Sequence, residues 1–210
     1  MTEKTQKHLE MMKDIYNVST SLGLKTYLWG GYAVDVLHGT LTREHSDIDG
    51  FTENLVEYKD ELIAEYESLG YSINLEYFDY MWMLIIKKDG EHAAFNSVKN
   101  IGGIAHWHHV GPRGTVFFPY KWLDDKPVDF YGSQVYTYGV EMAYLIKTNI
   151  NLLNPEMQAR EKDKSDIAVL EQIILAKNID EKEIRRKIWC HSPYLYEKGY
   201  EEYLLPVMFV

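Results

Sequence analysis

Two carboxylates separated by one residue, Asp47 and Asp49, are the part of the sequence best suited to chemistry. On a β-strand their side chains would share one face, with Cβ atoms about 7 Å apart, because a strand rises roughly 3.3 Å per residue. Two such carboxylates repel each other unless a cation lies between them. Mg²⁺ binds carboxylates together with substrate phosphates and neutralises the charge that develops in phosphoryl transfer. A solvated acidic strand end has the same residues, so the interpretation depends on what surrounds the pair.

The residues before the acidic pair are of types that bind phosphate. Gly30 and Gly31 lie between an expected strand and an expected helix, where backbone N–H groups and the helix dipole can approach a phosphate. Arg43 and His45 add possible donors just before the acidic pair. Each feature alone is common, since such glycines often form turns and such side chains are often structural. Their order together indicates a site for a metal-bound phosphate.

The hydrophobic pattern predicts the elements that position these residues. The first part of the chain reads as helix, strand, helix, strand and helix, over residues 4–22, 25–29, 32–39, 46–52 and 55–69. Three strands follow at 71–78, 80–88 and 92–99, the last two joined by a hairpin at Asp89-Gly90. Residues 103–135, rich in glycine, proline and aromatic residues, read as irregular β-structure or short hairpins.

The hydrophobic pattern becomes helical near residue 138. Three helices are expected from there on, over 138–150, 159–177 and 180–190. We therefore predict an α+β fold in which a mixed β-sheet is flanked by helices. The predicted division is an α+β domain over 1–135 and a C-terminal helical region over 136–210.

The stretch "GGYAVDVLHGTLTREHSDIDGF" resembles the signature of the aminoglycoside and lincosamide nucleotidyltransferases, members of the DNA polymerase β-like nucleotidyltransferase superfamily. The matching positions are Gly30, Gly31, Tyr32, Asp35, Gly39, Thr42, Arg43, His45, Asp47, Ile48 and Asp49. Further along, "REKDKSDIAVL" is similar to the Lys-Asp-x-x-Asp helix of the family's C-terminal domain, and the hairpin at 80–98 falls where the family has its third core strand.

The resemblance implies transfer of AMP, or another nucleoside monophosphate, from a nucleoside triphosphate such as ATP to a hydroxyl group of a small molecule. Asp47 and Asp49 would hold Mg²⁺, as two ions, and the Gly30–Gly31 turn would hold the triphosphate. Arg43 and His45 would assist. The resemblance also implies candidates from the helical region that would reach the phosphates across the site, namely Lys147 and Lys162.

One position departs from the family pattern. The resemblance implies a third carboxylate on a neighbouring strand, as a metal ligand or as the base for the acceptor hydroxyl, and the position expected for it is Ala94. Glu91 is three residues away, so on a regular strand it would face the opposite side. This departure predicts slow or absent turnover and leaves the predicted fold unchanged.

Charge and composition limit the kinds of molecule that the protein is expected to bind. The 210 residues include 22 basic and 32 acidic residues, a net charge of −10, which disfavours a broad nucleic-acid surface and suits a cationic acceptor. An aminoglycoside is therefore favoured over a lincosamide. A single cysteine, a charged N-terminus without a secretory pattern and the absence of any apolar run long enough to cross a membrane predict a cytoplasmic protein. A homodimer is compatible with the sequence.

Two other functions stay open. The first is a catalytically impaired nucleotide-binding protein on the same fold, which Ala94 favours. The second is a nucleotidyltransferase of the toxin–antitoxin kind that acts on protein or tRNA, and the acidic balance disfavours the tRNA substrate.

Overall fold

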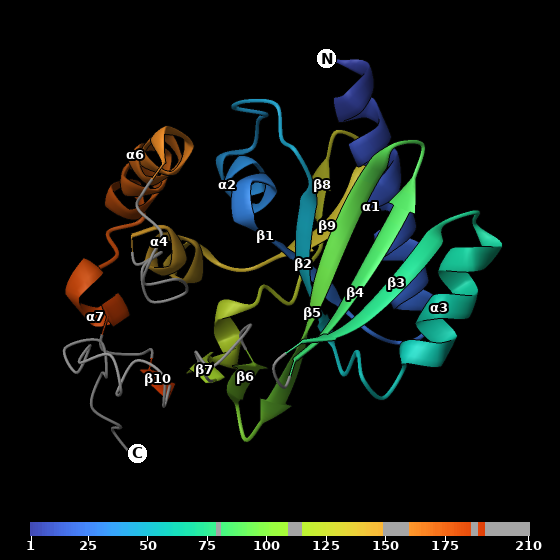
Figure 1. Cartoon of the computed structure of the whole chain (residues 1–210). Coiled ribbons are helices and arrows are strands. Elements are labelled where there is room, and N and C mark those ends of the chain that lie inside the picture. The colour runs from blue at the N-terminus through green and yellow to red at the C-terminus, as the bar shows by residue number, and fades with distance from the viewer. Residues whose placement is uncertain (79–80, 109–114, 149–159, 186–188, 192–210) are drawn as a thin grey trace.

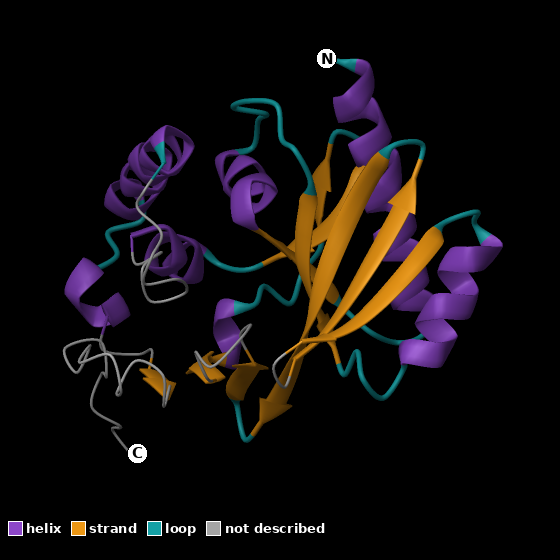
Figure 2. Cartoon of the chain, in the orientation of Figure 1, coloured by secondary structure: helices purple, strands orange, loops and turns teal. Residues whose placement is uncertain are grey.

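A mixed β-sheet organises the chain, with helices packed on both of its faces (Figures 1 and 2). The computed structural model describes residues 1–78, 81–108, 115–148, 160–185 and 189–191. Among these residues the strand order is β10-β7-β6-β5-β2-β1-β9-β8, and β3 and β4 extend the sheet from β5. The strands are β1 (Thr26–Trp29), β2 (Ile48–Glu53), β3 (Ser72–Phe78), β4 (Met81–Lys88), β5 (Glu91–Ile101), β6 (Ile104–His108), β7 (Thr115–Pro119), β8 (Val128–Phe130), β9 (Ser133–Thr137) and β10 (Trp189–His191).

Caps mark several of the helix ends. Thr2 precedes the first helix, and its hydroxyl oxygen accepts a hydrogen bond from the Thr5 N–H at 3.2 Å. Gly39, with φ +86°, ends the second helix in the left-handed conformation that glycine adopts easily. The described helices are α1 (Glu3–Ser21), α2 (Gly30–His38), α3 (Lys59–Ser68), the 3₁₀ turn η1 (Tyr120–Trp122), α4 (Val140–Thr148), α6 (Glu161–Ala176) and α7 (Glu181–Arg185).

The two faces of the sheet bury two hydrophobic clusters. On one face α1 and α3 pack against alternate strand residues such as Ile48 and Ala93. The opposite face holds Tyr27, Phe51 and Trp107, together with side chains from α4 and α6. Side chains alternate along a strand, so β2 and β5 divide their residues between the two clusters. Asp49 and Ala94 belong to the face that looks toward α4 and α6.

Most elements expected from periodicity are present, including the hairpin at Asp89-Gly90, where both residues have positive φ (52° and 85°). The helix predicted over 180–190 is present as α7 and wrong at its end, because Trp189–His191 forms β10 and pairs antiparallel with β7; residues 186–188 lie outside the described residues. Pairing with a distant strand overrides the local helical pattern there. None of the helices in the described ranges is long and apolar enough to span a membrane.

The predicted division at residue 135 stays a prediction. β9 runs across that position and pairs in parallel with β1. Residues 192–210 of the predicted helical region lie outside the described residues.

Candidate active site

The turn between β1 and α2 brings the N-terminus of a helix beside Asp49. Gly30 has φ +73°, and its N–H donates to the Tyr138 hydroxyl oxygen at 3.1 Å. A Cβ atom at Gly30 would lie 3.1 Å from Asp49 Oδ2. Glycine suits both the left-handed backbone and this close approach. The first N–H groups of α2 have no partner inside the helix, so the turn presents donors next to a carboxylate.

Gly31 is needed for a different reason. A Cβ atom there would overlap the Arg43 guanidinium and the His45 ring. Contacts with buried carboxylates hold both side chains in place: Asp166 binds Arg43, and Asp35 binds His45. The two consecutive glycines therefore let Asp49 approach on one side and Arg43 on the other.

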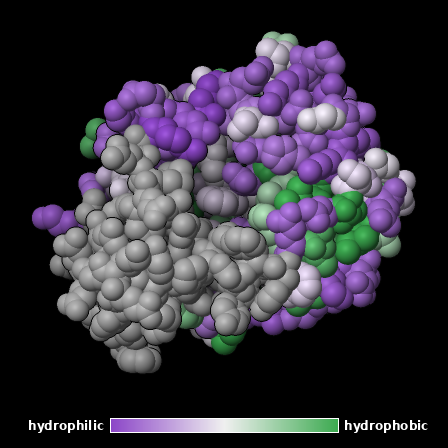
Figure 3. All heavy atoms as spheres, viewed as in Figure 1, coloured by the Kyte–Doolittle hydropathy of each residue, from purple (hydrophilic) through white to green (hydrophobic). Residues whose placement is uncertain are grey.

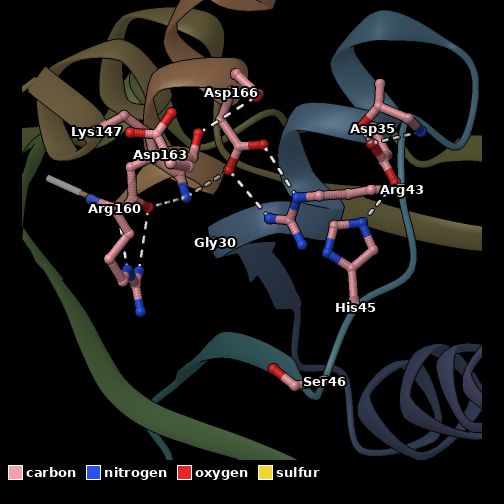
Figure 4. Close-up of polar contacts among 12 residues, drawn as sticks. Gly30, Asp35, Arg43, His45, Ser46, Lys147, Arg160, Asp163 and Asp166 are labelled. Atoms are coloured by element: carbon pink, nitrogen blue, oxygen red, sulfur yellow. Dashed lines mark hydrogen bonds and ion pairs between the residues drawn. The ribbon is translucent and has the colours of Figure 1, made fainter.

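Asp35 fixes the loop that leads into β2 (Figure 4). Its fully buried carboxylate accepts hydrogen bonds from the Thr42 N–H at 3.1 Å and the Thr42 hydroxyl at 2.5 Å. Its other oxygen lies 2.6 Å from His45 Nε2. The His45 ring packs on Tyr32, with 4.1 Å between ring centroids. His45 is thus buried by contacts that position the loop, and the prediction that it assists the triphosphate stays a prediction.

The acidic pair lies at the start of β2, with Asp47 just before the strand and Asp49 as its second residue. Ser46 donates to Asp47 Oδ1 at 2.9 Å. Burial raises the pKa of Asp49 to about 7, and the charge of Asp47 acts in the same direction. The two carboxylates are therefore close enough to repel each other, as the spacing predicts.

Three cations oppose this repulsion from the helical side. The charges of Lys147, Lys162 and Arg160 favour the ionised form of Asp49 and so act to lower its pKa. Figure 4 shows Lys147, from α4, and Arg160, which precedes α6, both turned toward Asp163. The site therefore joins two carboxylates to a group of positive charges, the combination that a metal-bound triphosphate requires.

Five alternating charges, here called the ion-pair chain, connect α4 and α6 to the loop before β2 (Figure 4). Arg43 Nη2 lies 3.1 Å from Asp166, and Asp166 lies 2.7 Å from Lys147 Nζ. Lys147 also contacts Asp163 at 3.2 Å, and Arg160 Nε contacts Asp163 at 2.7 Å. Lys147, only 6% exposed, is neutralised by the two aspartates, which a buried ammonium group requires.

The ion-pair chain also controls the ionisation of its acids. Burial disfavours the charged form of Asp163, but hydrogen bonds from Arg160 and the positive charge of Lys147 outweigh it. The pKa of Asp163 is therefore held well below its usual value. Because Asp163 stays ionised, it keeps its ion pairs with Lys147 and Arg160.

The two lysines predicted to reach the phosphates differ in their surroundings. Lys147 Nζ is already bound by Asp163 and Asp166. Lys162, half-buried in the first turn of α6, has no ion pair within the described ranges, and its charge acts on Asp49. Direct contact of either lysine with phosphate stays a prediction.

Ala94 lies on β5, the strand next to β2. β2 and β5 are parallel, and Asp49 pairs with Ala94. Paired residues on adjacent strands point to the same face, so Ala94 presents a methyl group beside Asp49. Glu91 faces away, because its carboxylate lies 3.0 Å from His8 of α1 on the opposite face. On the site face of β5, the neighbours of Ala94 by alternation are His92 and Asn96.

The residues fit a magnesium ion that is shared with phosphate. In the described part of the chain, no group of three or more His, Cys, Asp or Glu side chains could hold a metal ion by itself. Asp47 and Asp49 supply hard oxygen ligands whose mutual repulsion a cation would relieve. Mg²⁺ is commonly held by one or two carboxylates with substrate phosphates and water, so this pair suits it.

Several residues of the site were not identified as such from the sequence. Asp35 and Tyr138 act through contacts with residues far along the chain, which local spacing does not reveal. For Arg160, Asp163 and Asp166 a signal existed: the two aspartates stand three residues apart at the start of a predicted helix, so they share a face. Their partners, Lys147 and Arg43, could not be assigned without the fold.

Comparison with known proteins shows the family and the fold of the chain. The family model described as "Aminoglycoside-2''-adenylyltransferase" matches residues 11–117. The solution structure of the antibiotic-resistance factor ANT(2'')-Ia is similar with a TM-score of 0.66 and 17% identity, over 94% of this chain and 95% of that chain. ANT(2'')-Ia in complex with adenylyl-2''-tobramycin gives a TM-score of 0.63 and 16% identity, over 92% and 99%.

A further similar structure is that of the lincosamide antibiotic adenylyltransferase LnuA, bound to lincomycin. The TM-score is 0.58 and the identity 21%, over 82% of this chain and 98% of that chain. No curated protein sequence matches the chain. At these identities the structural likeness shows the fold, and the family model shows the family.

Proposed function

We propose that this chain, which belongs to the aminoglycoside-2''-adenylyltransferase family, transfers AMP from ATP to a hydroxyl group of a small-molecule antibiotic in a Mg²⁺-dependent reaction. The observation that carries the proposal is the convergence at Asp49. The Gly30 turn, Asp47 and the cations of α4 and α6 all act on that one carboxylate.

Each residue has a role that follows from its position. The Gly31 N–H and the N–H groups that follow it at the start of α2 hold the phosphates, because the Gly30 N–H is bound to Tyr138. Arg43 stands beside them with its guanidinium fixed by Asp166. Arg160 and Lys162 add positive charge from α6. Together these groups orient the triphosphate for attack by the acceptor oxygen, and positioning supplies much of the rate in phosphoryl transfer.

Asp47 and Asp49 would hold the magnesium, two ions being the number that we expect. When bound, magnesium neutralises the charge that develops on the phosphate oxygens. The protein's part is to keep both carboxylates ionised and close together. The three cations assist, because their charges act against the burial and the Asp47 charge that raise the pKa of Asp49 to about 7.

The net charge, the family description and the surface beside Asp49 all bear on the identity of the acceptor. The net charge of −10 favours a cationic acceptor of the aminoglycoside kind, and the family description points the same way. The surface of the sheet next to Asp49 is apolar, however, since Ala94, Ile85 and Met83 are half-buried there, and this favours an acceptor with an apolar face.

A pyrophosphate-release assay tests the proposal. The protein is incubated with ATP, Mg²⁺ and a panel of aminoglycosides and lincosamides, in parallel with Asp47→Asn and Asp49→Asn variants. We expect release with at least one drug, loss of release in both variants, and no release when EDTA removes the metal. Full activity in either variant would contradict the assigned metal-binding role.

A nucleotide-binding protein with impaired turnover is the second candidate, because Ala94 stands where an acid is expected beside Asp49. A thermal-shift measurement with a non-hydrolysable ATP analogue separates the two. The enzyme binds the analogue and releases pyrophosphate from ATP when drug is added. The impaired protein binds the analogue and releases none.

A further inference from the structure

A strip of the sheet beside Asp49 offers a surface to the acceptor. Ala94 pairs with Asp49 on one side and with Ile85 of β4 on the other, so all three side chains share a face. One pair further along, Asn96 lies opposite Met83 on the same face. At a strand spacing of about 4.8 Å, this strip begins about 5 Å from Asp49 and extends to about 10 Å.

The strip, here called the acceptor floor, consists of Ala94, Ile85, Met83 and Asn96. Ala94, Ile85 and Met83 are each half-buried, so part of their apolar surface meets solvent. Figure 3 shows apolar atoms gathered at the surface over this part of the sheet. A floor of this kind gains free energy by covering the apolar face of a ligand.

Asn96 supplies a polar group within this apolar surface. Asn96 is 6% exposed, and its amide makes no hydrogen bond within the described ranges, although it is not among the fully buried atoms that lack a partner. Buried amides in folded proteins are normally paired, so an amide without a partner is a place where a ligand can contribute. One amide both donates and accepts, which suits a hydroxyl or amide group of the acceptor.

A stacked aromatic wall borders the floor. Phe51 pairs with Asn96, and the Trp29 ring stacks on Phe51 with 5.5 Å between centroids. The indole N–H of Trp29 is also buried without a hydrogen-bond partner in the described part of the chain. Phe51 is fully buried, so the half-buried Trp29 supplies the apolar surface of this wall, together with one more unsatisfied donor on the same side of Asp49.

The charges of the site are divided between two sides. The cations Arg160, Lys147 and Lys162 belong to the helices, where the phosphates are proposed to lie. Across the floor, Glu76 of β3 belongs to the same face; it pairs with Met83 and accepts a hydrogen bond from Asn74 at 2.6 Å. A polycation is normally bound by several carboxylates, and the floor itself contributes none.

We propose that the acceptor is an amphipathic, hydroxyl-bearing molecule that lays an apolar face on the acceptor floor and hydrogen-bonds to the Asn96 amide. Asn96 is then a specificity-determining residue, and a polycation is not the preferred acceptor. This inference rests on the proposed adenylyl transfer, because it takes the molecule beside Asp49 to be the acceptor.

Calorimetric titration of lincomycin and tobramycin tests the inference. Each drug is titrated into the protein with Mg²⁺ and a non-hydrolysable ATP analogue, after analogue binding has been measured alone. Lincomycin is the amphipathic probe and tobramycin the polycationic one. The variants are Asn96→Ala and Ile85→Ser in the floor, with Glu76→Gln as the matched control at its acidic edge.

We expect lincomycin to bind, and Asn96→Ala to weaken it about fivefold, the share of one net hydrogen bond. Ile85→Ser should make the heat-capacity change of binding less negative, because less apolar surface is covered. Glu76→Gln should leave lincomycin binding unchanged, and analogue binding should be unchanged in all three variants. Because Asn96→Ala removes a group without a partner, it remains an informative test if Ile85→Ser fails to fold.

Tobramycin binding that is lost in Glu76→Gln and kept in Asn96→Ala would overturn the inference, as would the absence of lincomycin binding. Failure of the ATP analogue to bind the parent protein would instead contradict the proposed adenylyl transfer. The two failures are therefore distinguished by the first titration alone.

Discussion

At the scale of single residues, Ala94 decides the expected rate. Its methyl group pairs with Asp49, where an acid would accept the proton of the acceptor hydroxyl. A general base typically contributes about 10²–10⁴-fold in rate. We expect Ala94→Asp to raise pyrophosphate release with ATP, Mg²⁺ and a bound drug by at least about tenfold, a conservative part of that range. A fully active parent that gains nothing would place the base elsewhere on the site face.

Arg43 is the residue on which nucleotide affinity should depend most directly. Arg43→Ala is expected to weaken binding of a non-hydrolysable ATP analogue by roughly 1.5–3 kcal/mol, the range of a hydrogen bond to a charged group. Calorimetry measures the affinity. Asp166→Asn is the control, because it loosens the Arg43 side chain and keeps its charge, and should cost less. Unchanged affinity in Arg43→Ala would assign this arginine to the ion-pair chain alone.

Asp49 should make stability depend on pH when metal is absent. Its folded pKa, about 7, lies above the ordinary 3.8, so its contribution is most favourable at low pH and is lost as pH rises through 7. The Asp49→Asn variant has no carboxyl group to ionise at this position, so its stability does not fall in this way as pH rises. Urea unfolding in EDTA should therefore show the variant gaining stability relative to the parent between pH 5 and pH 8.

Asp163→Asn is the control with the opposite sign. The pKa of Asp163 is lowered, so its ionised form stabilises the fold above its ordinary pKa and this contribution is lost on acidification. The Asp163→Asn variant should be less stable than the parent at both pH 5 and pH 8. If Asp49→Asn behaved in the same way, the raised pKa of Asp49 would be refuted.

Residue types and spacing predicted the acidic pair and the glycine turn because both depend on neighbours in sequence. Asp35 could not be given a role in this way. It matched the motif, but its bonds to Thr42 and His45 form only when the loop folds back over α2. The acceptor floor could not be predicted either. Its residues come from β4 and β5, and only the strand register shows that they share the face of Asp49.

At the scale of elements, the ion-pair chain holds α4 and α6 to the loop before β2. Removing its middle cation by Lys147→Met would leave two buried aspartates facing each other. Breaking a buried pair in this way costs about 3–5 kcal/mol. Arg160→Ala is the matched variant at the half-exposed end, where an ion pair contributes only about 0–1 kcal/mol. Urea unfolding at pH 7 measures both, and equal losses would contradict the assigned burial of Lys147.

Periodicity predicted most helices and strands because each has an apolar face that local sequence encodes. The exception, the stretch that ends in β10, gains its pairing from β7, far away in the sequence. The same holds for ion pairs, because a partner that lies far away in the sequence cannot be predicted from the local pattern. The i, i+3 aspartates of α6 were visible in the sequence, whereas their cations come from α4 and from the loop before β2.

At the scale of the whole molecule, nucleotide should connect the two parts of the chain that the sequence predicts. The proposed phosphate site draws Gly30 from the first part and Arg160 and Lys162 from the second. Binding should therefore protect the start of α2 and the start of α6 together in hydrogen exchange, and a saturating analogue at 100 times its Kd adds about 2.7 kcal/mol of stability. Protection confined to one part would argue against a shared site.

The crowding at Gly31 has a consequence for how this chain can vary. Every other amino acid adds at least one carbon where the Arg43 guanidinium and the His45 ring already lie, and both are anchored by buried carboxylates. Gly23 has φ +70° but nothing within 4 Å of an added Cβ, so asparagine is an acceptable replacement there. In a library that samples every codon under antibiotic selection, position 31 should therefore be recovered as glycine alone, while position 23 should return several residues.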